Sequence, residues 1–302
     1  MPESLLTQPV VPRNAGGRLF VVGTPIGNLE DITFRAIRTL KQVDLVACED
    51  TRRTQKLLAY YSIRTTVISY YEHNELTRAP ELILRMEDGS QIALVSDAGM
   101  PVISDPGYRL VKLAVRHNIP VIPVPGPSAL VASLAAAGLP VDHFHFIGFL
   151  PARKVARQKA LKALSSVSGT IVFFEAPHRI VETLGDLQRA LGDRPTVLAR
   201  EVTKVYEEFV RGSVSEVLDR LERKPIKGEV TVLVGPPADS ADPLAKPTRL
   251  WPILAEMKNL MAHKGLDERT ALKALAKSRG ISRSEAYRQW QRERSLAGDD
   301  EA

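Results

Sequence analysis

The feature that most constrains the fold of this chain is the alternation of short β-branched segments with helical segments, which begins at residue 18. Segments of this length are typical of buried strands, and helical spacing between them indicates an α/β sheet. The first five strands are expected at 18–22, 44–48, 65–69, 92–96 and 120–124. A second set is expected at 143–149, 169–175, 196–202, 207–212 and 228–235, with helices at 153–165, 177–191 and 213–223. The sequence therefore predicts two αβ domains.

Breaks in this pattern give the expected domain limits. Residues 1–17 lack a basic region and a continuous apolar segment, so they are interpreted as a disordered tail and not as a signal peptide. The two αβ domains are expected at 18–140 and 141–236. Residues 237–249, rich in Pro, Ala and Asp without periodicity, are interpreted as a linker to an all-α segment at 250–296.

The single cysteine, Cys48, excludes a disulfide framework and a thiolate-rich metal site. A lone thiol is compatible with a reducing compartment, so a cytoplasmic protein is expected. Residues 119–141 carry no charge over a span long enough to cross a bilayer, but the prolines clustered at 120, 123, 125 and 127 favour a strand, a turn and a helix start. No membrane partner is therefore expected.

Positive charge is concentrated near the C-terminus. Residues 246–296 contain 12 Lys and Arg against 5 Asp and Glu, whereas residues 1–245 contain 29 against 27. Such an appendage suggests a polyanionic partner, most often nucleic acid, although a solvated helical face would give the same count.

The helical signals of this appendage are specific. Asp267 is placed to begin one helix, and Ser282 with Glu285 forms a capping box for a second. Two short helices around a turn resemble a helix-turn-helix module, and the residues expected to contact RNA from its outer surface are Arg279, Arg283 and Arg288. A small packing or dimerisation bundle is the alternative.

Four loops that follow strands carry unusual residues. They read GTPIGNLED (23–31), EDTRRT (49–54), LVSDAGMPVISDPG (94–107) and VPGPSAL (124–130). Because open α/β sheets bind ligands at the carboxyl ends of their strands, these loops are expected to form the binding site. None has the dinucleotide-binding glycine pattern or the lysine of a nucleoside-triphosphate loop.

Each loop favours a role. Gly99 allows a ligand to approach the backbone, and the nearby Asp97 suits a ligand with a positive charge or a ribose diol. Ser128 and Ala129 are expected at the first turn of a helix, where free N–H groups bind polar ligands. The charge density of 49–54 favours a substrate-facing role over a merely capped helix.

Together with IGFLP, FFEAPHRI and GEVTVLVG, these motifs resemble the tetrapyrrole methylase-like class of S-adenosylmethionine methyltransferases, within it the branch that acts on small-subunit ribosomal RNA, over residues 18–236. The resemblance implies S-adenosylmethionine bound as cofactor in a cleft between the two αβ domains, a homodimer, and methylation of a cytidine ribose 2′-hydroxyl in the decoding region of that RNA. The RNA is expected to be bound within the assembled or assembling subunit, with naked RNA left open as the alternative. It also implies that the cofactor contacts Pro25, Asp97, Gly99, Met100, Ser128, Ala129, Phe174, Glu175 and Ala176.

A ribose hydroxyl is a weak nucleophile, so a general base would assist methyl transfer. Glu49 and Asp50 are the candidates for this base. Arg52, Arg53 or Lys204 would hold phosphate or polarise the oxygen, with Arg53 assigned to RNA. Neither spacing nor resemblance distinguishes among them.

No metal is expected, because the histidines show no ligand spacing apart from His143 and His145, which share one face of a strand. Two alternatives remain open. One is an enzyme of the same fold that methylates a tetrapyrrole carbon, and the other is a ribosome-assembly protein that binds RNA without catalysis.

Overall fold

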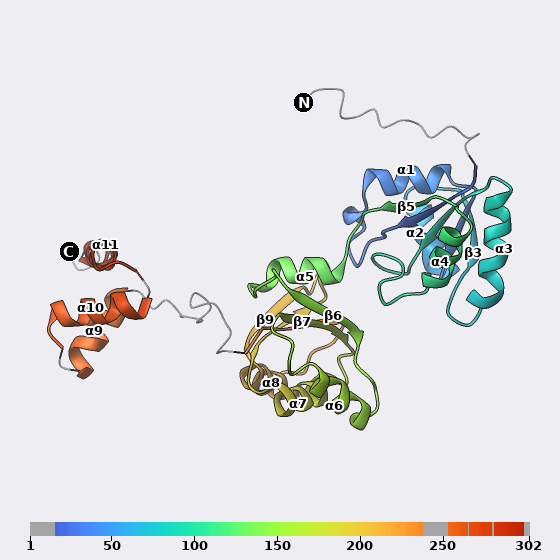
Figure 1. Cartoon of the computed structure of the whole chain (residues 1–302). Coiled ribbons are helices and arrows are strands. Elements are labelled where there is room, and N and C mark those ends of the chain that lie inside the picture. The colour runs from blue at the N-terminus through green and yellow to red at the C-terminus, as the bar shows by residue number, and fades with distance from the viewer. Residues whose placement is uncertain (1–15, 238–252, 265, 280, 299–302) are drawn as a thin grey trace. The chain divides into compact units, whose positions relative to one another are not determined.

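The computed structural model describes residues 16–237, 253–264, 266–279 and 281–298 (Figure 1). The chain divides into two compact units, Met1–Ala238 and Asp239–Ala302. All but two residues of the expected tail and all but the first residue of the expected linker lie outside the described residues. The described residues of the first unit form two sheets with helices, and those of the second unit form helices only, so the predicted α/β class with a C-terminal all-α segment is confirmed.

The first sheet is wholly parallel, with strand order β3-β2-β4-β1-β5. Its strands are β1 (Arg18–Val22), β2 (Leu45–Cys48), β3 (Thr66–Ser69), β4 (Gln91–Val95) and β5 (Val121–Val124). One face packs against α1 (Phe34–Gln42) and α2 (Thr51–Tyr60), and the other against α3 (Glu75–Glu87) and α4 (Tyr108–Arg116). Burial on both faces explains why these strands are largely apolar. Because all of them are parallel, their carboxyl ends lie at one edge of the sheet.

The second sheet is mixed, with strand order β6-β7-β10-β8-β9 and parallel pairing only between β6 and β7 among its four strand pairs. Its strands are β6 (Phe144–Phe149), β7 (Thr170–Glu175), β8 (Pro195–Arg200), β9 (Glu208–Ser213) and β10 (Val230–Val234). One face packs against α6 (Lys154–Ala163), α7 (Ile180–Leu191) and α8 (Val214–Arg223). All ten strands expected from the sequence are therefore present.

Helix α5 (Ala129–Ala137) covers the other face of the second sheet, where Leu134 and Ala137 pack against Val172 and Leu233. From residue 129 on, the chain therefore packs against the second sheet, whereas the sequence places the domain limit near residue 140. We call residues 16–128 the first lobe and residues 129–237 the second lobe. Because α5 directly follows β5, its N-terminus faces the carboxyl edge of the first sheet.

A buried ionic cluster joins α6 to α7. The side chains of Arg157 and Asp186 are both fully buried, and their Nη2 and Oδ2 atoms lie 2.7 Å apart. Gln158 Nε2 also donates to Asp186, at 2.8 Å, and Arg157 contacts Glu182 at 2.7 Å. A buried charge must be paired in this way because an unpaired one is strongly destabilising.

The C-terminal unit contains α9 (Ile253–Lys264), α10 (Glu268–Arg279) and α11 (Arg283–Gly298). They enclose a core that includes Leu272, Leu275 and Trp290. The two helices predicted after residue 266 are confirmed, and Ser282 Oγ accepts a hydrogen bond from the Glu285 N–H as the capping box predicts. Within the described residues, no helix combines the length and the apolar character needed to cross a bilayer.

Candidate active site

Three loops of the first lobe meet at the carboxyl edge of its sheet. Thr24 and Gly99 exchange two backbone hydrogen bonds, at 2.9 and 3.0 Å, and Thr24 Oγ1 donates to the Ser96 carbonyl at 3.2 Å. Gly23 and Gly126 approach so closely that a Cβ on Gly23 would lie 2.7 Å from the Gly126 Cα. The loops after β1, β4 and β5 are therefore joined into one floor, and glycine is required where their backbones touch.

The loop after β4 has an unusual backbone. Val102 and Ser104 adopt positive φ angles of 77° and 62°, and Gly99 and Gly107 adopt 83° and 137°. Positive φ is costly for a residue with a β-branched side chain, and such strain persists where the surroundings over-determine it. Here it turns the loop so that Ser104 and Asp105 line a cavity.

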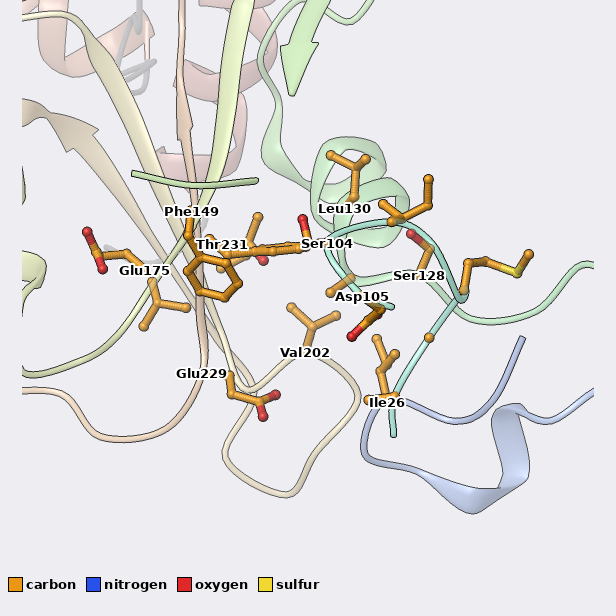
Figure 2. Close-up of a pocket in the computed structure, with 18 of the residues that line it drawn as sticks. Ile26, Ser104, Asp105, Ser128, Leu130, Phe149, Glu175, Val202, Glu229 and Thr231 are labelled. Atoms are coloured by element: carbon orange, nitrogen blue, oxygen red, sulfur yellow. The ribbon is translucent and has the colours of Figure 1, made fainter. Parts of the chain in front are cut away.

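The cavity has a volume of about 380 Å³, within the range of small-molecule sites. Both lobes line it. Its apolar part includes Ile26, Leu130, Phe149 and Val202, and its polar side chains include Asp105, Ser128, Glu229 and Thr231 (Figure 2). Three carboxylates but no lysine or arginine occur among the described residues that line it. The cavity is therefore suited to a ligand that is partly apolar and not anionic.

Seven of the nine residues expected at the cofactor line this cavity: Gly99, Met100, Ser128, Ala129, Phe174, Glu175 and Ala176. Ser128 is the N-cap of α5 and its Oγ accepts from the Val131 N–H at 3.4 Å, so the predicted helix start is confirmed. The remaining two, Pro25 and Asp97, are not part of the lining. Contact of any of these residues with a cofactor stays a prediction.

Asp97 links neighbouring loops of the first lobe. Its Oδ1 accepts from the Asp50 N–H at 3.0 Å, and its Oδ2 lies 3.2 Å from Arg53 Nη1. The carboxylate is thus occupied by protein groups behind the cavity. Asp97 positions the loop after β2 against the loop after β4.

Glu175 is held away from the cavity although its backbone borders it. Its carboxylate accepts from the Ala176 N–H at 2.8 Å, from Thr183 Oγ1 at 2.7 Å and from Arg179 Nη2 at 3.3 Å. Figure 2 shows this carboxylate directed away from the other lining side chains. Glu175 therefore fixes the turn between β7 and α7.

The EDTRRT loop is organised as a helix start. Asp50 is the N-cap of α2, accepting from the Arg52 N–H at 2.9 Å and from the Arg52 guanidinium at 3.2 and 3.0 Å. These hydrogen bonds lower the pKa of Asp50 to about 2, which makes it a weak base at neutral pH. Burial, with repulsion from Asp97, raises the pKa of Glu49. Glu49, Asp50 and Arg52 are not part of the cavity lining.

Lys204 bridges two carboxylates of the second lobe. Its Nζ lies 3.0 Å from Glu201 Oε1 and 3.0 Å from Glu229 Oε2. Although burial alone would lower it, these contacts raise the pKa of Lys204. Its aliphatic stem covers Gly27 so closely that a Cβ there would lie 2.2 Å from Lys204 Cγ. Lys204 therefore connects the loop after β1 with the second lobe.

Asp105 belongs to a loop that the sequence singles out, yet the sequence assigns it no role. Its carboxyl faces the cavity, with Glu49 and Asp97 as its charged neighbours (Figure 2). Burial, followed by repulsion from these two carboxylates, raises the pKa of Asp105 to about 6, although a hydrogen bond with Ser96 opposes the shift. The available signal was a second acid in the same glycine- and proline-rich loop. Its orientation depends on the positive φ angles, which no spacing rule reveals.

The arginines of the C-terminal unit differ in their surroundings. The Arg279 side chain is 7% exposed and its Nη2 lies 2.6 Å from Glu256 Oε2, so its expected place on the outer surface is wrong. It faces inward because α9, a part of the expected helical segment for which no separate bounds were predicted, packs beside α10. Arg283 and Arg288 are exposed.

Within the described residues, no group of three or more His, Cys, Asp or Glu side chains is arranged to hold a metal ion.

Comparison with curated proteins gives close relatives. A protein of Halalkalibacterium halodurans named Ribosomal RNA small subunit methyltransferase I is 45% identical over 277 residues, covering 91% of this chain and 95% of that protein. Proteins of the same name from Thermotoga maritima and Bacillus subtilis are 50% identical over 218 residues and 42% identical over 273 residues. They cover 72% and 90% of this chain, with 98% and 93% of their own lengths matched.

Solved structures share the fold at lower identity. Diphthine synthase superposes with a TM-score of 0.57 at 18% identity, covering 72% of this chain and 90% of that one. Uroporphyrin-III C-methyl transferase from Thermus thermophilus, complexed with S-adenyl homocysteine, gives 0.52 at 23% identity, covering 72% and 97%. Residues 18–218 match the family described as Tetrapyrrole (Corrin/Porphyrin) Methylases. The chain belongs to this family and, within it, to the group of ribosomal RNA small subunit methyltransferase I proteins.

Proposed function

We propose that this protein transfers a methyl group from S-adenosylmethionine to the ribose 2′-hydroxyl of a cytidine in the decoding region of small-subunit ribosomal RNA. Relatives named for small-subunit ribosomal RNA match over nine-tenths of both chains. The geometric support is the charge of the cavity, to which Asp105 presents its carboxyl and whose lining includes neither lysine nor arginine among the described residues. A cationic sulfonium is favoured there, whereas a nucleotide phosphate is not.

The cavity also fits the rest of such a cofactor. Gly99, with φ of 83°, leaves space where a Cβ would lie 3.3 Å from Ile26 Cγ2. Ser128 and Ala129 begin α5, whose first N–H groups have no partner within the helix and are able to bind carboxylate or ribose oxygens. The apolar side chains of Ile26, Leu130 and Phe149 provide a surface for an adenine ring.

In this proposal the cofactor supplies an activated methyl group, and the protein supplies alignment. The floor formed by the three first-lobe loops fixes the donor site, and the second lobe closes it with Phe149, Val202 and Thr231. Holding the acceptor oxygen in line with the methyl group accounts for most of the acceleration expected of such an enzyme.

The RNA is proposed to bind outside the cavity. Arg52, Arg53 and Lys56 lie exposed on α2, next to the loop after β2, and Arg283 and Arg288 lie exposed on α11. Phosphate contacts of this kind position RNA without reading its sequence. We also propose a homodimer in the cytoplasm, where ribosomal RNA is modified.

The test is mass spectrometric mapping of ribose methylation in ribosomal RNA from cells with and without the gene. A cytidine methyl group in the decoding region that disappears on deletion and returns with the intact gene is expected. Titration calorimetry with S-adenosylhomocysteine provides the second arm, in which a cofactor-free RNA-binding protein gives no heat. Unchanged ribose methylation after deletion would refute the proposal.

A further inference from the structure

Three carboxylates line the cavity, and two of them are engaged by other protein groups. Glu175 accepts hydrogen bonds from Ala176 and Thr183 and points away from the cavity. Glu229 lies 3.0 Å from Lys204 Nζ. Among the described residues, Asp105 forms no ion pair with a lysine, arginine or histidine. Asp105 is therefore the lining carboxylate that remains able to accept a proton.

The backbone holds Asp105 in place. It lies between Ser104, with φ of 62°, and Pro106, and the next residue, Gly107, has φ of 137°. A Cβ on Gly107 would lie 2.7 Å from Leu94 Cδ2 and 2.9 Å from Val102 Cγ2, so the turn is packed against β4 and cannot relax easily. A rigid, strained turn that presents one acid to a cavity is typical of functional positions.

The surroundings of Asp105 keep its proton affinity near neutrality. Glu49, from the end of β2, and Asp97, from the end of β4, are the charged groups that face it, and Ser96 is its hydrogen-bond partner. Arg53 pairs with Asp97 and leaves Asp105 without a cation. With its pKa raised to about 6, Asp105 is ionised at neutral pH and still a useful base, because catalytic proton transfer is most efficient when the pKa lies near the working pH.

We propose that Asp105 is the general base of the methyl transfer, with Glu49 and Asp97 as positioning residues that tune it. This inference rests on the proposed function. The hydroxyl oxygen forms a bond to the methyl carbon while the carbon–sulfur bond breaks, and the electron pair of that bond goes to sulfur. The hydroxyl proton goes to a carboxylate oxygen of Asp105 and is released to water when product leaves.

The test compares Asp105→Asn and Glu49→Gln with Asp219→Asn, a matched control on an exposed site of α8. The methyl acceptor is the small ribosomal subunit from cells lacking the gene. Asp105→Asn is expected to lower kcat by about 10²- to 10⁴-fold. Its affinity for S-adenosylhomocysteine, measured by calorimetry, is expected to equal that of the wild type.

The pH dependence separates the base from its neighbour. In the wild type, log kcat/KM is expected to fall on the acidic side near the pKa of Asp105. In Glu49→Gln this fall is expected at lower pH, because the repulsion that raises the pKa of Asp105 is removed. In Asp105→Asn it is expected to be absent. At pH 8 Glu49→Gln is expected to lose much less kcat than Asp105→Asn, because its base is still present but weaker. A kcat loss in Glu49→Gln as large as that in Asp105→Asn would identify Glu49 as the base and overturn the proposal.

A stability measurement needs no activity. A carboxyl whose folded-state pKa is raised destabilises the fold above that pKa. The Tm of Asp105→Asn is therefore expected to be higher than that of the wild type at pH 8 and about equal to it near pH 4. Asp105→Asn with wild-type kcat, or with lost S-adenosylhomocysteine affinity, would refute the base assignment. If Asp105→Asn does not fold, the pH profile of Glu49→Gln tests the proposal: an acidic limb that does not move to lower pH would refute it. Wild-type protein that methylates no small-subunit RNA would instead refute the proposed function.

Discussion

One methyl group added at Gly23 should disturb the cavity floor, because the backbones of two loops touch there. A Cβ at this position would lie 2.7 Å from the Gly126 Cα and 2.7 Å from Met100 Sδ. The thioether can rotate away, but the Gly126 Cα is backbone between Pro125 and Pro127 and must retreat by about 0.7 Å to reach ordinary contact at 3.4 Å. Overpacking of this kind costs about 1–3 kcal/mol.

The matched control is Gly185→Ala on α7, where the nearest atom to a new Cβ is Arg189 Nη1 at 3.8 Å. Alanine is favoured over glycine inside a helix by about 0.5–1 kcal/mol, so this variant is expected to be slightly more stable than the wild type. Gly23→Ala is expected to lower Tm by about 2–12 °C, at about 2–4 °C per kcal/mol for a unit of this size.

Differential scanning calorimetry measures Tm, and titration calorimetry measures S-adenosylhomocysteine affinity for the same samples. Because the shifted loops carry Gly99, Met100 and Ser128, Gly23→Ala is also expected to bind the ligand more weakly, whereas Gly185→Ala keeps the wild-type affinity. Gly23→Ala with wild-type Tm and wild-type affinity would show that the loops are not joined as described.

Three further results are expected. Arg157→Met should lower the free energy of unfolding at pH 7 by about 3–5 kcal/mol, because it removes the buried guanidinium that is paired with the buried Asp186 carboxylate. Burial alone would raise the pKa of Asp186, but hydrogen bonds from its neighbours lower it to about 2. The difference in free energy of unfolding between wild type and Arg157→Met, measured by urea titration, should therefore shrink as pH falls below 4. Deleting residues 239–302 should leave S-adenosylhomocysteine affinity intact but flatten the salt dependence of RNA binding, and an unchanged slope would assign the C-terminal unit to packing. Arg288→Ala should weaken RNA binding with unchanged Tm, whereas Arg279→Ala should destabilise the bundle by breaking its contact with Glu256, as separate melting and binding assays would show.

The sheets were predictable from sequence because buried strands impose a local signature. A strand such as β1 or β10 consists almost entirely of apolar residues, and glycine or proline residues follow its end. The ligand loops were recognisable for the same reason, since close backbone approach requires glycine at positions such as Gly23 and Gly99. Helix α9 lies within the helical segment expected at 250–296, but its bounds were not predicted because it carries a weak amphipathic pattern.

The roles of charged side chains were harder to predict, because they depend on distances between loops that are far apart in sequence. The sequence shows Asp50, Asp97 and Asp105 as three similar acids. In the structure one caps a helix, one links two loops and one faces the cavity. Their pKa values diverge accordingly where a shift is resolved, to about 2 for Asp50 and about 6 for Asp105. The Asp50 shift comes from Arg52, two residues along the chain, whereas the Asp105 shift comes from burial and from carboxylates that include Glu49 of another loop.

The separation of charge between cavity and surface has a consequence for how substrate would be bound. Two exposed arginines of α2 are paired with acids: Arg53 lies 3.2 Å from Asp97, and Arg52 lies 3.0 Å from Asp50. Both side chains remain at least 70% exposed, so each guanidinium retains N–H groups for a phosphate outside the cavity. A cationic donor inside and a polyanion outside therefore do not compete for the same protein groups. Cofactor affinity should accordingly be nearly independent of salt, while RNA affinity should fall steeply with it.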